Sequence, residues 1–376
     1  SGHLAADRYQ MSDKMEYFAV RNAAGLFDSS PLYKYWIRGR DATRFLSGVL
    51  ARDIRQCGPG QAQYTCWLDD RGFVIEDGVI LHTAKDEYLL TSAEPNLAYF
   101  ADRIGRDQVT IEEVSHDIGT LALQGPRSRA LLAKLVPQME KIPYFGVAKG
   151  EIGGAAVTVS RTGYSGDLGY EVWIDAADAL HVWDTLWDSM EGHGVLPFGL
   201  AALYMLRIEA GLLLLDADFD SSRYAWNDAH RSTPIELGWS WMFKDLKTDD
   251  RAFIGRKALQ REIADKTSRW AMRGLIVDWR DYDRVYGDAG LIPPKDHAPI
   301  VEDWMLYDDE YQRVGYATSF MYSPMLQRHI ALARVRPDFA KLGTKVNLEF
   351  TVDHHYEQVA AHVARLPLYN PERKTA

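Results

Sequence analysis

Residues 161–171 of the chain read RTGYSGDLGYE. The run from Gly169 to Ile174 alternates in polarity and predicts a strand. The face of this strand that carries Tyr170 is apolar, whereas Glu171 and Trp173 fall on the opposite face. A carboxylate beside an indole on one face of a strand indicates a lined pocket. The alternative is an edge strand whose outer face is solvated, and the pattern alone favours that alternative.

A second carboxylate, Asp77, lies in the run VIEDGVI at residues 74–80. If this run is one regular strand, Asp77 shares a face with Ile75 and Val79. A carboxylate on an apolar face is costly unless it is paired or used, so Asp77 becomes a candidate functional residue. The alternative is that Gly78 marks a bulge and that Asp77 caps a turn.

Arg207 is the third residue whose chemistry does not fit its surroundings. It lies in a helix predicted over residues 200–215, which is apolar nearly all round and therefore buried. A buried guanidinium needs an anionic partner. Glu209, two residues away, points elsewhere on a helix. The partner is either another buried carboxylate or a bound ligand.

The wider pattern is that of a mixed α and β protein. Two strands are predicted over residues 73–92, around a turn at Ala84 to Asp86. From about residue 274 the chain consists of strands and turns, and residues 345–352 alternate cleanly, which predicts a β-rich C-terminal module. Within it, residues 281–297 are predicted to be a loop near its start.

Composition excludes several classes of protein. The chain has 376 residues, of which 47% are hydrophobic and 26% are charged, so we expect two or three folded domains. A formal net charge of −10 argues against a nucleic-acid binder. The two cysteines, Cys57 and Cys66, form no metal or disulfide motif and suit reduced thiols. No run approaches 18 apolar residues, so no membrane span and no membrane partner are expected, and we predict a cytoplasmic protein without a metal.

Taken together, these segments resemble the glycine-cleavage T-protein (aminomethyltransferase) family. The motif at residues 161–171 is the most specific part of the resemblance. The other matching segments, in chain order, are AGLFD at 24–28, IRGRDA at 37–42, GQAQY at 60–64, GFVIED at 72–77, LALQGP at 121–126, LRIEAG at 206–211, TPIE at 233–236, FIGRKAL at 253–259, TS at 318–319, SP at 323–324 and LP at 366–367. The resemblance covers nearly the whole chain.

The resemblance implies an α+β fold of three domains in a cloverleaf around a central channel that holds tetrahydrofolate. The implied domains are residues 1–50 with 117–220, residues 51–116 with 221–272, and a β-barrel over residues 273–376. The barrel agrees with the β-rich C-terminal module.

The resemblance also implies roles in binding tetrahydrofolate for several of the candidate residues. Glu171 matches the carboxylate that holds the pterin, whose amide and exocyclic amine offer two N–H donors side by side. The other expected cofactor-binding residues are the channel-lining aromatics Tyr64 and Trp241, the polar Ser92, Arg373 near the folate tail, and Arg207, for which a bound ligand is one possible partner.

Asp77 matches the family's catalytic aspartate, which lies near the reactive folate nitrogens. Either Tyr164, which also matches an aromatic position of the channel, or Tyr204 is expected to face the one-carbon donor. These three residues form the predicted catalytic group.

The sequence departs from the T-protein itself at several points. Ser29-Ser30-Pro31-Leu32 stands where that enzyme has Ser-His-Met, and Leu203-Tyr204 replaces its Arg-Asp. The paired acidic motif is reduced to Glu76-Asp77. These differences favour a branch resembling dimethylsulfoniopropionate demethylase, in which tetrahydrofolate takes a methyl group from a small methylated sulfonium, ammonium or aryl-ether compound.

Two other functions stay open. The first is aminomethyl transfer in the glycine cleavage system, the one case in which a lipoyl carrier protein would be a partner. The second is folate binding without catalysis, although the Lys-Gly-Cys-Tyr-x-Gly-Gln-Glu motif of such relatives is absent from this chain.

Overall fold

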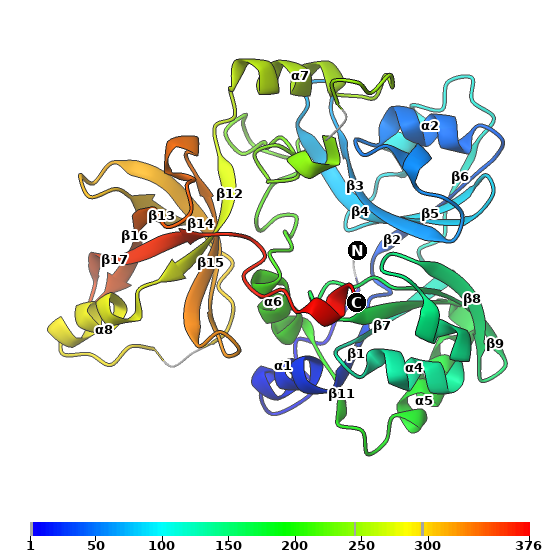
Figure 1. Ribbon diagram of the computed structural model, residues 1–376, viewed down its shortest axis with the longest axis horizontal. Helices are drawn as coiled ribbons and strands as arrows, with labels where there is room; N and C mark the ends of the chain where they lie inside the picture. Colours follow the sequence, from blue (N-terminus) through cyan, green and yellow to red (C-terminus); the bar gives the residue numbers. More distant parts are fainter. Residues whose placement is uncertain (1–2, 244–245, 295–296) are drawn as a thin grey trace. The chain divides into compact units, whose positions relative to one another are not determined.

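The computed structural model describes residues 3–243, 246–294 and 297–376, and the chain divides into two compact units. The first unit comprises Ser1–Leu203, Asp245–Arg256 and Pro371–Ala376, and the second comprises Tyr204–Lys244 and Lys257–Asn370. The helices and strands of both are labelled in Figure 1. The predicted bounds of three domains stay a prediction.

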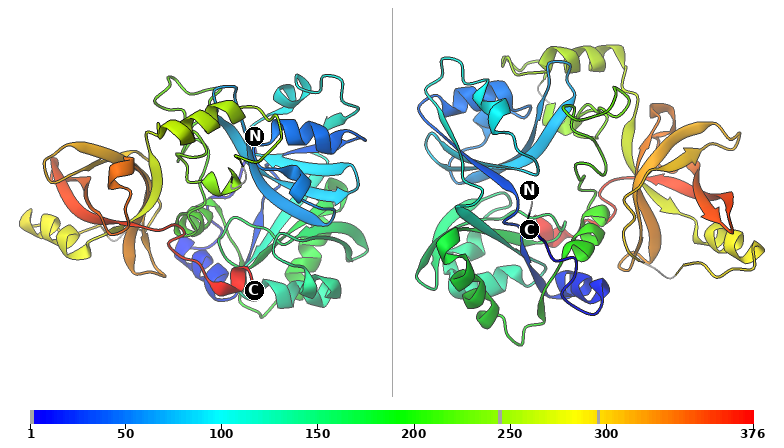
Figure 2. Two further views of the ribbon diagram at one scale, coloured as in Figure 1. Left: turned by 45° about the horizontal axis from the view of Figure 1, so that its top comes forward. Right: turned by 180° about the vertical axis from the view of Figure 1, so that it is seen from behind.

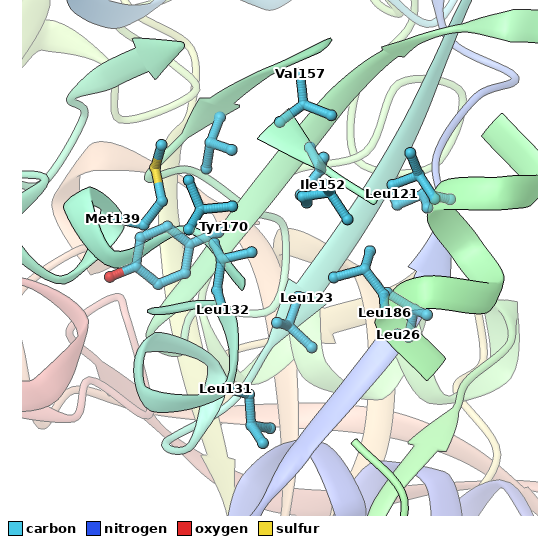
Figure 3. Packing of buried hydrophobic residues seen from close by; sticks show 14 of the residues in the cluster. Leu26, Leu121, Leu123, Leu131, Leu132, Met139, Ile152, Val157, Tyr170 and Leu186 are labelled. Atoms are coloured by element: carbon cyan, nitrogen blue, oxygen red, sulfur yellow. The ribbon is translucent and has the colours of Figure 1, made fainter. Parts of the chain in front are cut away.

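The first unit contains a six-stranded sheet in the order β11-β1-β7-β10-β9-β8. These strands are β11 (Val195–Pro197), β1 (Ala24–Asp28), β7 (Ile118–Gln124), β10 (Gly169–Asp175), β9 (Ala155–Ser160) and β8 (Val147–Ile152). Helices α4 (Ser128–Leu135) and α5 (Ala179–Ser189) pack on one face, while α1 (Asp13–Asn22) contacts β1 and β11. Figure 3 shows the core between this face and the helices, where Leu123, Tyr170 and Leu186 are buried.

A second sheet of the first unit has five strands in the order β3-β4-β5-β2-β6. These are β3 (Gln61–Leu68), β4 (Val74–Ala84), β5 (Glu87–Ser92), β2 (Tyr33–Arg38) and β6 (Thr110–Glu113). Helices α2 (Ala42–Val49) and α3 (Leu97–Ala101) contribute to the core on one of its faces. The predicted pair of strands over residues 73–92 is confirmed as β4 and β5, and Asp86 turns the chain with a φ of 58°.

The two sheets of the first unit share a small apolar cluster. Trp173 of β10 is buried there with Ala62 of β3, Leu81 of β4 and Leu89 of β5. The face of β10 that carries Trp173 is therefore directed towards the second sheet, and the face of β4 that carries Leu81 is directed back towards it.

The second unit contains a closed barrel in the order β12-β15-β14-β13-β16-β17, which Figure 2 shows in two further views. Its strands are β12 (Ala271–Val277), β15 (Arg328–Val335), β14 (Arg313–Ser323), β13 (Trp304–Tyr307), β16 (Lys345–Val352) and β17 (His355–Ala364). The predicted α+β class and C-terminal barrel are confirmed. Helix α7 (Arg256–Asp265) precedes the barrel, and α8 (Trp279–Asp288) follows its first strand.

Two sequence predictions were wrong in detail. The helix predicted over 200–215 is α6 (Leu200–Glu209), which ends early because Gly211 adopts a φ of +63° that favours glycine and ends the helix. The start of the loop predicted over 281–297 is helical, since the Asp278 side chain accepts N–H bonds from Arg280 and Asp281 and caps α8.

Cys57 and Cys66 are free thiols and are both buried. No helix in the described part of the chain is long and apolar enough to cross a membrane.

Candidate functional site

Asp77 and Tyr64 form a hydrogen-bonded pair on neighbouring strands of the second sheet. Cys66 of β3 lies opposite Asp77 of β4, and Tyr64 lies opposite Val79, so these four side chains share a face. The Tyr64 hydroxyl donates a hydrogen bond of 2.7 Å to Oδ2 of Asp77. The structure thus brings together two residues that the sequence assigned to one site.

Pairing of β4 with β3 continues through Gly78, so the alternative of a bulge at Gly78 is wrong. The register shift falls where Trp67 pairs with Glu76 and Leu68 pairs with Val74, which leaves Ile75 as the extra residue. Ile75 consequently packs in the core on the far side of the sheet and does not share the face of Asp77. Val79 does share that face and packs against the cluster between the sheets.

The environment of Asp77 is electrostatically unusual. Burial raises the pKa of Asp77 to about 6, and the hydrogen bond from Tyr64 acts against that rise. Burial and the charge of Asp77 hold the pKa of Tyr64 well above its ordinary value, so its hydroxyl stays a donor. At neutral pH the pair therefore presents an ionised carboxylate that is fixed by a phenol.

Glu76 is a residue that the sequence reading did not single out. It is buried on the opposite face of β4 and accepts hydrogen bonds from the backbone N–H groups of Ala93 and Glu94, at 3.3 and 3.1 Å, and from Nδ2 of Asn96 at 3.2 Å. Burial and the charge of Asp77 raise the pKa of Glu76 to about 8. The signal that could have found Glu76 is the alternation of β4, which places it on the core face of the sheet.

Ser92 forms a hydrogen bond to the segment 93–94, whose backbone N–H groups bind Glu76. Its buried hydroxyl donates to the Glu94 carbonyl oxygen at 2.6 Å. Its role in cofactor binding stays a prediction.

Glu171 lies on an interior strand, so the alternative of an edge strand is wrong. β10 pairs with β7 on one side and with β9 on the other. The Thr162 hydroxyl donates a short hydrogen bond to Oε2 of Glu171. Burial raises the pKa of Glu171, and the bond from Thr162 opposes the rise. Because Glu171 shares its face with Trp173, it lies on the side of the first sheet directed towards Asp77.

The loop between β9 and β10 carries Tyr164, which is half-buried. Tyr164 is close enough to Tyr64 for its charge to add to the rise in the pKa of Tyr64. Gln124 of β7 anchors the loop, since its Nε2 donates to the Thr162 carbonyl at 3.2 Å and its Oε1 accepts from Ser165 Oγ at 2.6 Å. A Cβ at Gly163 would come within 2.1 Å of Gln124 Oε1, so a larger residue there would have to displace the Gln124 amide.

Arg373 also reaches this loop. It lies in the short helix η6 (Glu372–Lys374) and binds both oxygens of Asp167, at 2.7 and 2.8 Å. Arg21 approaches the same carboxylate at 3.2 Å. Arg373 is thus placed beside the motif 161–171, and its contact with a folate tail stays a prediction.

The other three candidate residues belong to the second unit. Arg207 is fully buried and donates to Asp218 Oδ2 at 2.6 Å and to Ser319 Oγ at 2.8 Å. A buried carboxylate is therefore its anionic partner, and its contact with a cofactor stays a prediction. Tyr204 lies one turn earlier on α6, with its ring centre 5.9 Å from the guanidinium carbon. Trp241 is in the short helix η4 (Ser240–Phe243) and is 43% exposed.

The described ranges contain no group of three or more His, Cys, Asp or Glu side chains that could hold a metal ion. The residues described above give the candidate site two carboxylates, each with a hydroxyl donor, and aromatic rings.

Comparison with known proteins gives a consistent family. The GCVT N-terminal domain family matches residues 4–245, and the Glycine cleavage T-protein C-terminal barrel domain family matches residues 289–370. An aminomethyltransferase of Cutibacterium acnes is 33% identical over 371 residues, which cover 95% of this chain and 90% of that protein. An aminomethyltransferase of Chlorobaculum parvum is 30% identical over 365 residues, with 95% and 90% covered.

The fold is also found in a solved structure. The crystal structure of the glycine cleavage system aminomethyltransferase T from Bartonella henselae matches with a TM-score of 0.80 and 24% identity. The match covers 97% of this chain and 92% of that one.

Proposed function

The chain belongs to the glycine cleavage T-protein family, and on that premise we propose that it is an enzyme that transfers an aminomethyl carbon to tetrahydrofolate. The observation that carries the proposal is the similarity to aminomethyltransferases over nearly the full length of this chain and of its relatives. The sequence alone favoured methyl transfer from a small methylated compound, but neither of these relatives is named as a demethylase.

The residues present suit the pterin of tetrahydrofolate. Oε2 of Glu171 accepts from Thr162, and Oε1 accepts no hydrogen bond from the described residues. A carboxylate has acceptor sites for several N–H groups, so Glu171 can take the adjacent amide and amine N–H groups of a pterin. The aromatic rings of Tyr64 and Tyr164, two residues that interact electrostatically, can pack on a flat heterocycle.

We assign the second carboxylate to the reacting end of the site. When bound, tetrahydrofolate supplies the nitrogens that accept the one-carbon unit. Asp77 holds a negative charge there, which stabilises positive charge that develops beside it, and Tyr64 fixes the orientation of its carboxylate. With a pKa of about 6, Asp77 is also suited to accept a proton near neutral pH.

Methyl transfer remains the second candidate because of one observation. Tyr204 replaces the aspartate of the family's Arg-Asp pair, and it lies half-buried one helical turn before Arg207. A neutral aromatic ring suits a methylated onium donor through cation–π contact better than it suits an amine that must leave as ammonia. Contact of Tyr204 with any donor is part of this proposal.

The two reactions are separated by their folate product. The protein is incubated anaerobically with tetrahydrofolate in two parallel reactions. The first contains an aminomethyl-lipoyl carrier as the donor, and the second contains a pool of methylated sulfonium, ammonium and aryl-ether compounds. We expect methylene-tetrahydrofolate and ammonia with the first donor. Methyl-tetrahydrofolate with the second would replace the proposal by a demethylase, and folate binding without any product would leave a non-catalytic folate-binding protein.

An acidic residue outside the site provides the matched control. Asp77→Asn removes the charge at the proposed reacting end, whereas Asp70→Asn removes an equal charge from an exposed turn between β3 and β4. We expect product formation to be lost in the first variant and retained in the second.

A further inference from the structure

Glu171 stands at the end of a chain of hydrogen bonds that runs through the first unit. Trp173 Nε1 donates to Ser160 Oγ at 3.0 Å. Ser160 Oγ lies 2.6 Å from Thr162 Oγ1, and Thr162 donates to Glu171 Oε2. Ser160 also lies directly opposite Glu171 in the pairing of β9 with β10, so these hydrogen bonds lie within one small region of the sheet.

The direction of this chain of hydrogen bonds is fixed by its two ends. An indole nitrogen can donate but cannot accept, so Ser160 must accept from Trp173. At the other end, an ionised Glu171 can only accept, so Thr162 donates its one proton to the carboxylate. Thr162 then has no proton left for Ser160, so Ser160 donates its own proton to Thr162. Both hydroxyls therefore donate towards the carboxylate, which favours its ionised form.

Packing alone does not account for these polar groups. Trp173, Ser160 and Thr162 are 4%, 0% and 6% exposed, respectively, whereas Glu171 is only partly buried. Buried polar groups gain little net stability over apolar groups of the same shape. Of the four side chains linked by these hydrogen bonds, the Glu171 carboxylate is the one that a ligand can reach. We therefore expect the hydrogen bonds to affect ligand binding at Glu171.

We propose that Trp173, Ser160 and Thr162 are positioning residues that hold Glu171 ionised and oriented for a flat heterocycle with two adjacent N–H donors. This inference rests on the proposed function and deepens it. The chain engages Oε2 from within the protein and leaves Oε1 for the ligand. A heterocycle that offers acceptors at this edge would meet no available proton and would be rejected.

The test is the pH dependence of folate binding, measured by calorimetry with 5-formyltetrahydrofolate as the probe. Thr162→Val removes the donor to Glu171, which raises the pKa of the carboxylate and brings its protonation into a higher pH range. We expect binding about tenfold weaker than wild type at pH 6. The difference in affinity should shrink as the pH rises, because Glu171 is then ionised in wild type and variant alike. Thr162→Ser retains the hydroxyl and should retain the wild-type profile.

Trp173→Phe tests whether the far end of the chain of hydrogen bonds acts on the carboxylate. Without the indole donor, the hydroxyl of Ser160 is a weaker donor to Thr162, because hydrogen bonds in a chain polarise one another. We therefore expect the same upward displacement of the binding profile, but a smaller one. Trp67→Phe is the matched control, because Trp67 is equally buried in the first unit and donates to Asn96 Oδ1 at 3.1 Å. Its loss should lower thermal stability without moving the binding profile.

The outcomes are distinct. If the wild type binds the folate and the Thr162→Val profile is unchanged, the positioning role is refuted while the proposed function stands. If Thr162→Val does not fold, Ser160→Ala interrupts the same chain one residue earlier and decides in its place. If the wild type binds no folate, the proposed function fails and this inference fails with it.

Discussion

Tyr64→Phe should move the pH dependence of one-carbon transfer. The substitution keeps the aromatic ring and removes the hydroxyl that donates to Asp77 at 2.7 Å. Because that bond stabilises the ionised carboxylate, its loss raises the pKa of Asp77 further above the present value of about 6. Activity that needs ionised Asp77 is present above this pKa and is lost as the pH falls through it.

The size of the effect follows from the strength of one hydrogen bond. A hydrogen bond to a charged group contributes about 1.5–3 kcal/mol. At 1.36 kcal/mol per pKa unit this moves the pKa upward by about 1–2 units. The ionised fraction of Asp77 at pH 7 would fall from about nine-tenths to between about one-half and one-tenth, so kcat/KM should fall about two- to tenfold at pH 7 and recover above pH 9.

The assay is kcat/KM for transfer to tetrahydrofolate across the pH range, for wild type and variant. The control is Tyr99→Phe, which removes a buried hydroxyl of the first unit that donates to the Leu68 carbonyl at 2.8 Å. The control should keep the acid limb of the wild type. An acid limb that stays in place in Tyr64→Phe, with a uniform loss of rate at every pH, would refute the assigned role of the pair.

Three further predictions concern stability, each measured by thermal or chemical unfolding. Asp77→Asn should be more stable than wild type by about 2–3 kcal/mol at pH 8, because the folded-state pKa of Asp77, about 6, lies above the ordinary 3.9 and ionisation of the carboxyl therefore disfavours folding. The stabilities of the two proteins should converge as the pH falls below about 4. Equal stabilities at pH 8 would contradict the raised pKa. Arg207→Met should lower the free energy of unfolding by about 3–5 kcal/mol, because it leaves the buried carboxylate of Asp218 without its cation. Adding Asp218→Asn should recover much of that loss. Additive losses in the double variant would argue against the ion pair. Gly163→Ala should cost about 1–3 kcal/mol through its clash with Gln124, and less than that in a Gln124→Ala background; an equal cost in both backgrounds would exclude that clash.

Features set by local pattern were predictable from the sequence. The strands β4 and β5, and the alternating strand β16, follow from side-chain periodicity and turn residues alone. The side of β4 on which Asp77 lies was also predicted, because it depends only on alternation from Val79.

Features set by partners distant in the sequence were not predictable in this way. β10 is an interior strand because β7, whose paired residues lie 45 to 57 positions earlier, pairs with one of its edges, and no pattern within β10 indicates that pairing. The bulge of β4 falls at Ile75 and not at Gly78 because pairing with Trp67 and Leu68 decides its place. Arg207 had two possible partners, and the turn at Gly211 brings Asp218 back to it.

The candidate site was predicted as separate residues more than as a network. The sequence identified Asp77, Glu171 and Tyr64, but the links from Thr162 to Glu171 and from Tyr64 to Asp77 arise from strand pairing and loop conformation. Thr162 and Ser160 are small polar residues that carry no distinctive pattern of their own.

The most direct test of the account is a crystal structure of the protein with 5-formyltetrahydrofolate. We expect the amide and amine N–H groups of the pterin within hydrogen-bond distance of Glu171, and the substituted nitrogen on the side of Asp77 and Tyr64. A folate bound elsewhere, with Glu171 and Asp77 both out of contact, would contradict the site proposed for this chain.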